Sequence, residues 1–111
     1  MAAFQHKSLA LGEWGKLSLA EQLGNIGSEV GRTAHWRGKD QKVFNGAADR
    51  ALELFDLTLD DPRWKGRLRE IARAREVFCD AVFNDGRAYK SRIEDLDKYF
   101  YNFAYAARRN L

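Results

Sequence analysis

The chain has 111 residues, 45% of them hydrophobic and 32% charged, and its 19 basic and 16 acidic residues give a net charge of +3. This size fits one domain, and the apolar content is too high for a disordered protein. The single cysteine, Cys79, excludes a disulfide framework and a cysteine-based zinc site. No apolar run approaches the ~20 residues that span a bilayer, so we expect a cytoplasmic protein without membrane contact.

The predicted organisation is an N-terminal arm over residues 1–17 and a helical domain over residues 18–111. The arm carries four apolar side chains, at Phe4, Leu9, Leu11 and Trp14. Whether it is an ordered arm that docks on a neighbour or a tail is left open by the sequence.

Four helix-start signals follow the arm. Ser18 and Glu21 form a capping box, as do Ser91 and Glu94, and Asp40 can cap a helix that starts after it. Asp61 precedes a proline, which suits the first position of a helix. The predicted helices therefore cover residues 18–37, 41–59, 62–83 and 92–108. With short connections and no strand pattern, these helices predict an all-α fold, an antiparallel up-down-up-down four-helix bundle.

Three glycines interrupt the first predicted helix. Each costs about 1 kcal/mol relative to alanine in a helix interior, so a reason for them is needed. Gly24 with Ser28, and Gly27 with Gly31, place small residues four apart on the helix. We interpret this spacing as a surface on which another helix packs closely.

The second and fourth predicted helices carry more apolar surface than a bundle core needs. Leu54 and Leu57 widen the apolar stripe of the second helix, and Tyr101 and Tyr105 lie four residues apart, away from the core side of the fourth. This excess predicts a subunit interface in a homo-oligomer. The alternative is that the N-terminal arm covers the same surface within one chain.

Basic residues concentrate near the start of the third predicted helix. Two groups form the candidate nucleic-acid contacts, namely Arg63, Lys65, Arg67, Arg69 and Arg73, with Arg32, Arg37 and Lys39 from the end of the first helix. If the two groups adjoin, they form one phosphate-binding patch, beside which Trp36 and Trp64 are available for base stacking. The alternative is an ordinary solvated helix face.

Arg75 falls on the predicted core stripe of the third helix. Because an unpaired buried guanidinium is costly, it should meet a carboxylate, with Glu29 and Glu53 as the candidates. We interpret this pair as structural.

The sequence offers no catalytic constellation. The two histidines, His6 and His35, have no cysteine or acidic partner at a recognisable spacing, and no phosphate-binding glycine loop is present. We therefore expect no enzymatic activity, no metal and no cofactor.

Three stretches in the first two predicted helices carry a family resemblance. They are Gly24 to Arg32, Asp40 to Phe44, and Ala51 to Leu54, which read GNIGSEVGR, DQKVF and ALEL. They resemble the bacterial four-helix-bundle family that includes the reading frames within ribosomal RNA intervening sequences. That family is related to the accessory variability determinant of diversity-generating retroelements. Ser28 and Val30 depart from the usual order of the family motif.

The resemblance implies a bundle that assembles as a homopentamer with a positively charged surface. It also implies RNA or DNA binding and a reverse transcriptase as partner. Two hypotheses follow. The first is a non-enzymatic, oligomeric nucleic-acid-binding accessory protein, and the second is a protein–protein interaction scaffold whose basic helix is merely solvated.

Overall fold

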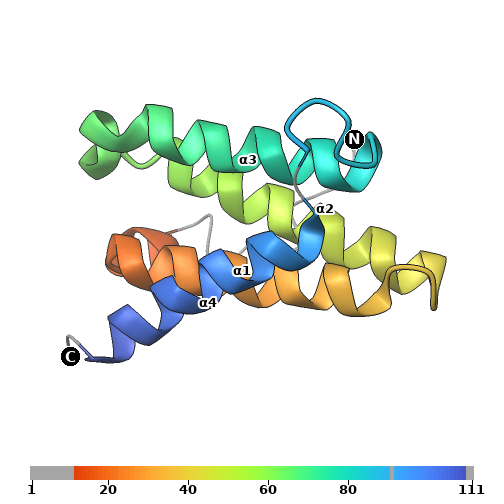
Figure 1. Cartoon of the computed structure of the whole chain (residues 1–111). Helices are drawn as coiled ribbons and strands as arrows, with labels where there is room; N and C mark the ends of the chain where they lie inside the picture. Colours follow the sequence, from red (N-terminus) through yellow and green to blue (C-terminus); the bar gives the residue numbers. More distant parts are fainter. Residues whose placement is uncertain (1–11, 91, 110–111) are drawn as a thin grey trace.

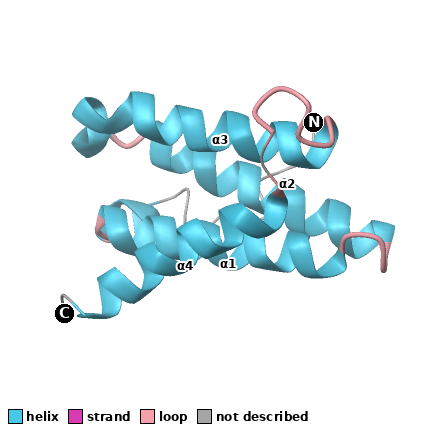
Figure 2. Cartoon of the chain, viewed as in Figure 1, coloured by secondary structure: helices cyan, strands magenta, loops and turns pink. Residues whose placement is uncertain are grey.

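Helices make up the structure, a computed structural model that describes residues 12–90 and 92–109 and, for residues 103, 104 and 106–109, the backbone alone. A short 3₁₀ turn, η2 (Trp14–Lys16), precedes α1 (Leu19–Trp36) and α2 (Gln41–Leu59). A second 3₁₀ segment, η3 (Pro62–Arg67), leads into α3 (Leu68–Phe83), and α4 (Ile93–Arg109) follows. Figure 1 shows α3 along one edge of the molecule and α1 with α4 along the other. The described residues contain no strand (Figure 2).

The capping residues act as the sequence predicts. The Ser18 hydroxyl accepts a hydrogen bond from the Glu21 amide at 3.1 Å, and the Glu21 carboxylate accepts one from the Ser18 amide at 2.9 Å. Asp40 accepts from the amides of Lys42 and Val43 at the start of α2. The capping box predicted at Ser91 lies outside the described residues.

The third predicted helix differs from the prediction at its start. Residues 62–67 form a 3₁₀ segment, and the α-helix begins only at Leu68. The backbone of Trp64 is not helical, with φ −101° and ψ 22°. Its indole N–H donates to the buried Gln22 side chain at 2.9 Å, and this contact holds the ring against α1. The sequence pattern could not predict that contact, since it joins residues 42 positions apart.

The core combines apolar side chains from all four α-helices. The ring of Phe55 in α2 lies 5.8 Å from that of Phe78 in α3 and 5.7 Å from that of Phe100 in α4, measured between centroids. Ile26 and Val30 of α1 are fully buried beside them. These five side chains thus bring α1, α2, α3 and α4 together in one apolar cluster.

Leu54 belongs to this core, with only 2% of its surface exposed. The prediction that Leu54 lies at a subunit interface is therefore wrong, because its apolar surface is already covered within the chain. Leu57 is half-buried and lines a hollow with Trp14. Trp14 itself belongs to the core, with 3% of its surface exposed. The other apolar arm residues, Phe4, Leu9 and Leu11, lie outside the described residues.

The predicted close crossing of α1 is confirmed, and α4 is the helix that uses it. A Cβ atom on Gly27 would come within 2.5 Å of the Phe100 Cβ and 3.2 Å of the Phe100 backbone. A Cβ on Gly31 would come within 2.7 Å of an Asp97 carboxylate oxygen. The glycines therefore let the backbone of α4 lie directly against α1.

A buried glutamine joins the N-terminal parts of the molecule. Gln22 is completely buried, and its side-chain amide donates to the carbonyl of Trp14 at 2.9 Å and to Asp61 at 3.0 Å. Its oxygen accepts from the Trp64 indole. The side chain thus connects η2, α1 and η3, and its contacts with Asp61 and Trp64 would be lost if α1 separated from η3.

Asp61 is the charged member of the same network. It is buried, and its carboxylate accepts from the Arg63 guanidinium at 2.7 Å and from the Arg63 amide at 3.1 Å. These bonds, together with the Gln22 contact, lower the pKa of Asp61 to about 2. Arg63 also donates to the carbonyl of Leu17 at 2.6 Å, which attaches η3 to the segment before α1.

A second acidic residue anchors the loop between α3 and α4. Asp80 is buried, and its carboxylate accepts from the amides of Ala88 and Tyr89 at 3.1 and 3.0 Å and from the Asn84 side chain. The hydrogen bond from the Tyr89 amide is the main cause of the lowered pKa of Asp80. The loop is therefore fixed to α3 before the chain enters α4.

Arg75 meets a carboxylate, as expected, but a different one from the two candidates. Its guanidinium donates to Asp56 at 2.9 Å, and its side chain is 33% exposed. Glu29 instead pairs with Arg50 at 2.9 Å and with Arg32 at 3.4 Å. Arg75 therefore lies at the rim of the α2–α3 contact rather than in the core.

Substitution of Gly27 by alanine should destabilise the protein by about 1–3 kcal/mol, because the added methyl would meet the Phe100 backbone, which cannot move aside cheaply. A larger side chain such as leucine should cost at least as much. The matched control is Gly46→Ala in α2, where the nearest atom is the flexible end of Arg50 at 3.6 Å. That variant should gain about 0.5–1 kcal/mol. Urea unfolding measures both, and equal effects would contradict the close α1–α4 contact.

Acid should remove the stability that Asp61 supplies. Because its pKa is about 2 in the folded protein and near 4 in the unfolded chain, its contribution is complete above pH 4 and is lost as the pH falls toward 2. We expect a contribution of about 1–2 kcal/mol, discounted because Arg63 is partly exposed. The difference in unfolding free energy between the wild type and Asp61→Asn should shrink over this range. A difference that is the same at pH 6 and pH 2.5 would contradict the assignment.

Candidate functional site: the groove between α1 and α4

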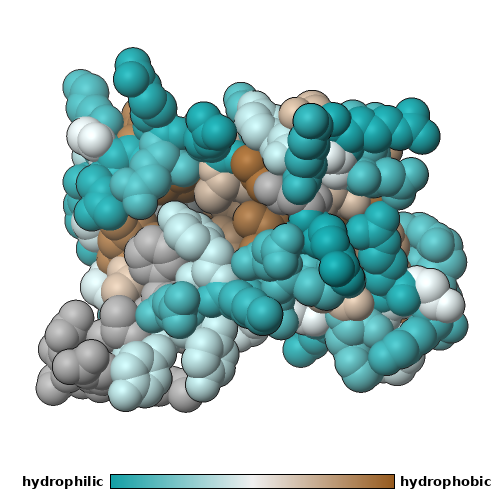
Figure 3. All heavy atoms as spheres, viewed as in Figure 1, coloured by the Kyte–Doolittle hydropathy of each residue, from teal (hydrophilic) through white to brown (hydrophobic). Residues whose placement is uncertain are grey.

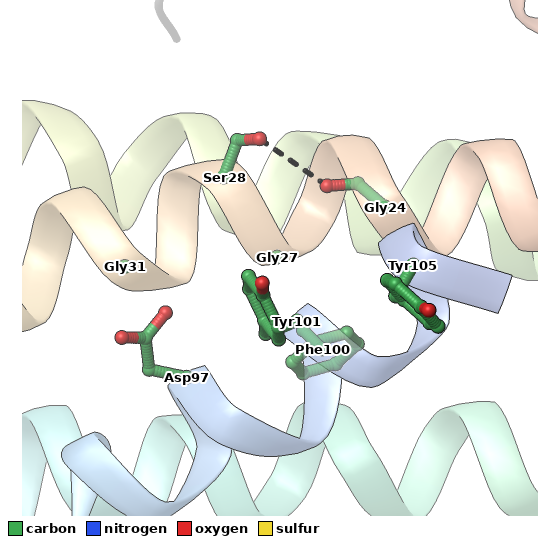
Figure 4. A pocket seen from close by; sticks show the side chains of 8 residues that line it. All are labelled: Gly24, Gly27, Ser28, Gly31, Asp97, Phe100, Tyr101 and Tyr105. Carbon is green, nitrogen blue, oxygen red and sulfur yellow. Dashed lines mark hydrogen bonds between the residues drawn. The ribbon is translucent and has the colours of Figure 1, made fainter. Parts of the chain in front are cut away.

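The close packing of α1 and α4 leaves a groove of about 350 Å³ along their contact (Figure 4). One side is formed by small residues of α1 and the other by an acidic residue and three aromatic residues of α4. The lining residues are Gly24, Gly27, Ser28, Gly31, Asp97, Phe100, Tyr101 and Tyr105. The Ser28 hydroxyl donates to the carbonyl of Gly24, as drawn in Figure 4, so it is satisfied within α1.

Two tyrosines give this groove its exposed aromatic surface. Tyr101 is 67% exposed and Tyr105 is 54% exposed, and the two lie one helical turn apart on α4. They are the two residues of the predicted interface that the structure brings together. Leu57 lies in a separate hollow, and Leu54 is in the core.

Asp97 adds a negative charge to the groove. It lies four residues before Tyr101, is half-buried, and its carboxylate lies against Gly31. Among the side chains that the structure describes, none forms an ion pair or hydrogen bond with Asp97. Asp97 was not among the residues predicted from the sequence, although residues 97, 101 and 105 fall on one face of a helix and could have indicated it.

Two of the candidate nucleic-acid contacts, one from each basic group, lie far apart. Arg63 lies at the start of α1, where it donates to Leu17, whereas Arg37 lies at the other end of α1, where it pairs with Asp85 at 3.0 Å. The 18 residues of α1 separate these points by about 27 Å. Arg63 and Arg37 are therefore too far apart to contact neighbouring phosphates, and the condition that the two groups adjoin is not met at these two residues.

Carboxylates neutralise half of the predicted contacts. The pairs are Arg63 with Asp61, Arg67 with Glu70, Arg37 with Asp85 and Arg32 with Glu29. The side chains of Lys65, Arg69 and Lys39 have no such partner in the described part of the chain. Arg73 lies over the ring of Tyr89, 5.5 Å from its centroid. We call Lys65, Arg69 and Arg73 the basic row. Figure 3 shows a strongly hydrophilic surface over the edge that α3 forms.

The tryptophans proposed for base stacking are not placed together. Trp64 is half-buried, and the Arg63 guanidinium already covers its ring at 4.4 Å from the centroid. Trp36 lies at the opposite end of α1, with its ring edge-on to that of His35 at 5.0 Å. The two rings therefore do not flank a common binding surface.

The groups that could carry chemistry are few. No cluster of three or more His, Cys, Asp or Glu side chains suited to a metal ion occurs among the described residues. Burial raises the pKa of the Cys79 thiol, so the nucleophilic thiolate is disfavoured. The structure brings no acid–base pair into the α1–α4 groove, where Asp97 is the single ionisable carboxylate.

Comparisons with known proteins give no match to a family model, to a curated protein or to a solved structure. No helix in the described part of the chain has the length and apolar character needed to cross a membrane. The groove and the basic row are thus the two surfaces that bear on function.

Proposed function

We propose that this protein is a non-enzymatic interaction bundle that self-associates through the α1–α4 groove. The observation that supports this proposal is the exposure of Tyr101 and Tyr105, at 67% and 54%, beside a groove with a glycine floor. Tyrosine is enriched at protein–protein contacts because a rigid ring buries a large area at little entropic cost. Gly27 and Gly31 are covered by α4, but Ser28 is exposed and Gly24 is half-buried, so small side chains border the open part of the groove.

The charge pairing of the basic residues favours contact with another protein over binding of nucleic acid. Four of the eight candidate phosphate contacts already have carboxylate partners, and Arg63 and Arg37 lie at opposite ends of α1. A phosphate group that contacted one of these four arginines would compete with its carboxylate. The ring of Tyr101, in contrast, is 67% exposed and can contact another protein without displacing a carboxylate.

Removal of both tyrosine rings should weaken self-association strongly. We expect the Tyr101→Ser, Tyr105→Ser double variant to lower the apparent association constant at least tenfold while the helix content stays near that of the wild type, since both rings are exposed. Sedimentation over a wide concentration range measures the association, and circular dichroism measures the helix content.

The matched control is Phe83→Ser. Phe83 is 66% exposed, as much as Tyr101, but lies at the end of α3 and does not line the groove. It should assemble like the wild type. If the wild type stays monomeric at all concentrations, or if Phe83→Ser disrupts assembly as strongly as the double variant, the proposal is wrong.

Nucleic-acid binding is a second candidate function, and the basic row favours it. Lys65 and Arg69 are exposed and have no carboxylate partner among the described residues, and Arg73 is exposed beside them. Such a row can follow a phosphate backbone. RNA, DNA and a reverse transcriptase partner, like a subunit number of five, come from the family resemblance and stay predictions.

If the basic row binds RNA, the affinity should fall with salt, with a log–log slope of about −2 for three phosphate contacts on a single strand. The Lys65→Glu, Arg69→Glu, Arg73→Glu variant should then lose RNA binding in a fluorescence anisotropy titration. Arg37→Glu, at the other end of α1, should retain it. Wild-type protein that does not bind at low salt would eliminate this function.

We also propose the up-down-up-down order of the helices. Three sets of contacts support it, because in each the residue numbers rise along one helix as they fall along its neighbour. Between α1 and α4, Gly27 lies against Phe100 and Gly31 against Asp97. Between α1 and the chain of α2 and its end, Glu29 pairs with Arg50 and Gln22 with Asp61. Between α2 and α3, Phe55 packs on Phe78 and Asp56 pairs with Arg75.

A further inference from the structure

Two surfaces of the chain carry complementary charges that the described part of the chain does not balance. The α1–α4 groove holds the carboxylate of Asp97 beside the rings of Tyr101 and Tyr105. The basic row holds the ammonium of Lys65 and the guanidinium of Arg69 on the outer side of η3 and α3. Complementary charges on two surfaces steer them together, fix the register of the contact and disfavour other partners.

The spacing of the two surfaces also agrees. Asp97 and Tyr101 are four residues apart on α4, which corresponds to a rise of about 6 Å, and Arg69 and Arg73 are four residues apart on α3. Two helices in contact can therefore place Arg69 on the carboxylate of Asp97 and, once Arg73 leaves the ring of Tyr89, place Arg73 on the ring of Tyr101. Guanidinium groups bind carboxylates through paired hydrogen bonds and stack on aromatic faces, so both contacts are favourable.

We propose that the occupant of the groove is the basic row of a second copy of this chain, with Arg69 of one copy paired to Asp97 of the other. This inference rests on the proposed self-association through the groove and adds which surface enters it. Because groove and row lie on different helices of the same chain, the contact is heterologous. A pair of copies joined by one such contact still has one free groove, on one copy, and one free row, on the other, so assembly continues into a ring or a filament rather than stopping at a two-fold dimer.

Complementary variants test this arrangement directly. A groove variant, Asp97→Asn with Tyr101→Ser, keeps its row, and a row variant, Lys65→Glu with Arg69→Glu, keeps its groove. Each should be monomeric alone at concentrations at which the wild type assembles. Mixed in equal amounts, they should form a 1:1 dimer and nothing larger, since only one intact groove and one intact row are present. Light scattering after size-exclusion chromatography gives the masses.

A second experiment measures how much the charge of Asp97 contributes to self-association. Asp97→Asn alone should weaken self-association about fivefold or more, whereas Glu94→Gln, on an exposed acid of α4 outside the groove, should leave it unchanged. Arg87→Glu, on an exposed arginine of the α3–α4 loop, is the matched control for charge reversal at Arg69 and should assemble as the wild type does. Circular dichroism establishes that each variant is folded.

The outcomes separate this inference from the proposal on which it rests. If the groove variant fails to assemble but the row variant assembles like the wild type, the groove is a contact surface and the basic row is not its occupant. If both variants fail alone and the mixture stays monomeric, the heterologous pairing is likewise overturned. A wild type that is monomeric throughout overturns both.

Discussion

The absence of a side chain at Gly27 is the constraint on which the arrangement of this protein depends most. A single added carbon there would lie 2.5 Å from the Phe100 Cβ, so α4 can take its place only because α1 presents bare backbone. The contact brings Phe100 into the core, against Phe55, and at the same time turns Asp97 and Tyr101 toward the groove. Core packing and the candidate site thus depend on the same pair of helices. The helix stability lost at the glycines of α1 is offset by this packing.

Polar contacts fix the segments that lie outside the apolar core. Gln22 and Asp61 fix η2 and η3 to the start of α1, and Asp80 fixes the loop that delivers the chain to α4. Buried polar groups are stable only when they are hydrogen-bonded, so these networks specify one arrangement where apolar packing alone would tolerate several. They also pair basic side chains that would otherwise be available to phosphate. Arg63 is held by Asp61 and Leu17, and it is therefore a structural residue rather than a free phosphate contact.

The sequence was a good guide to local features and a poor one to pairings across the fold. The capping residues Ser18 and Asp40 act through amides within three positions, so their spacing alone identifies them. The close α1 crossing could be predicted because glycine in a helix has few other uses. In contrast, the Asp56 partner of Arg75 depends on how α2 and α3 are rotated, which no periodicity determines. Leu54 failed as an interface residue for the same reason, because a wide apolar stripe does not tell which helix covers it.

When copies of the chain meet, the α1–α4 groove should be covered. Hydroxyl-radical footprinting of the aromatic residues, at protein concentrations from dilute to assembled, tests this directly. Tyr101 and Tyr105 should lose reactivity as the concentration rises, whereas Phe83, which is 66% exposed at the end of α3 and does not line the groove, serves as the internal reference. A loss at Tyr101 and Tyr105 that exceeds any change at Phe83 is the predicted result. Unchanged reactivity of both groove tyrosines in a sample that has assembled would contradict the account.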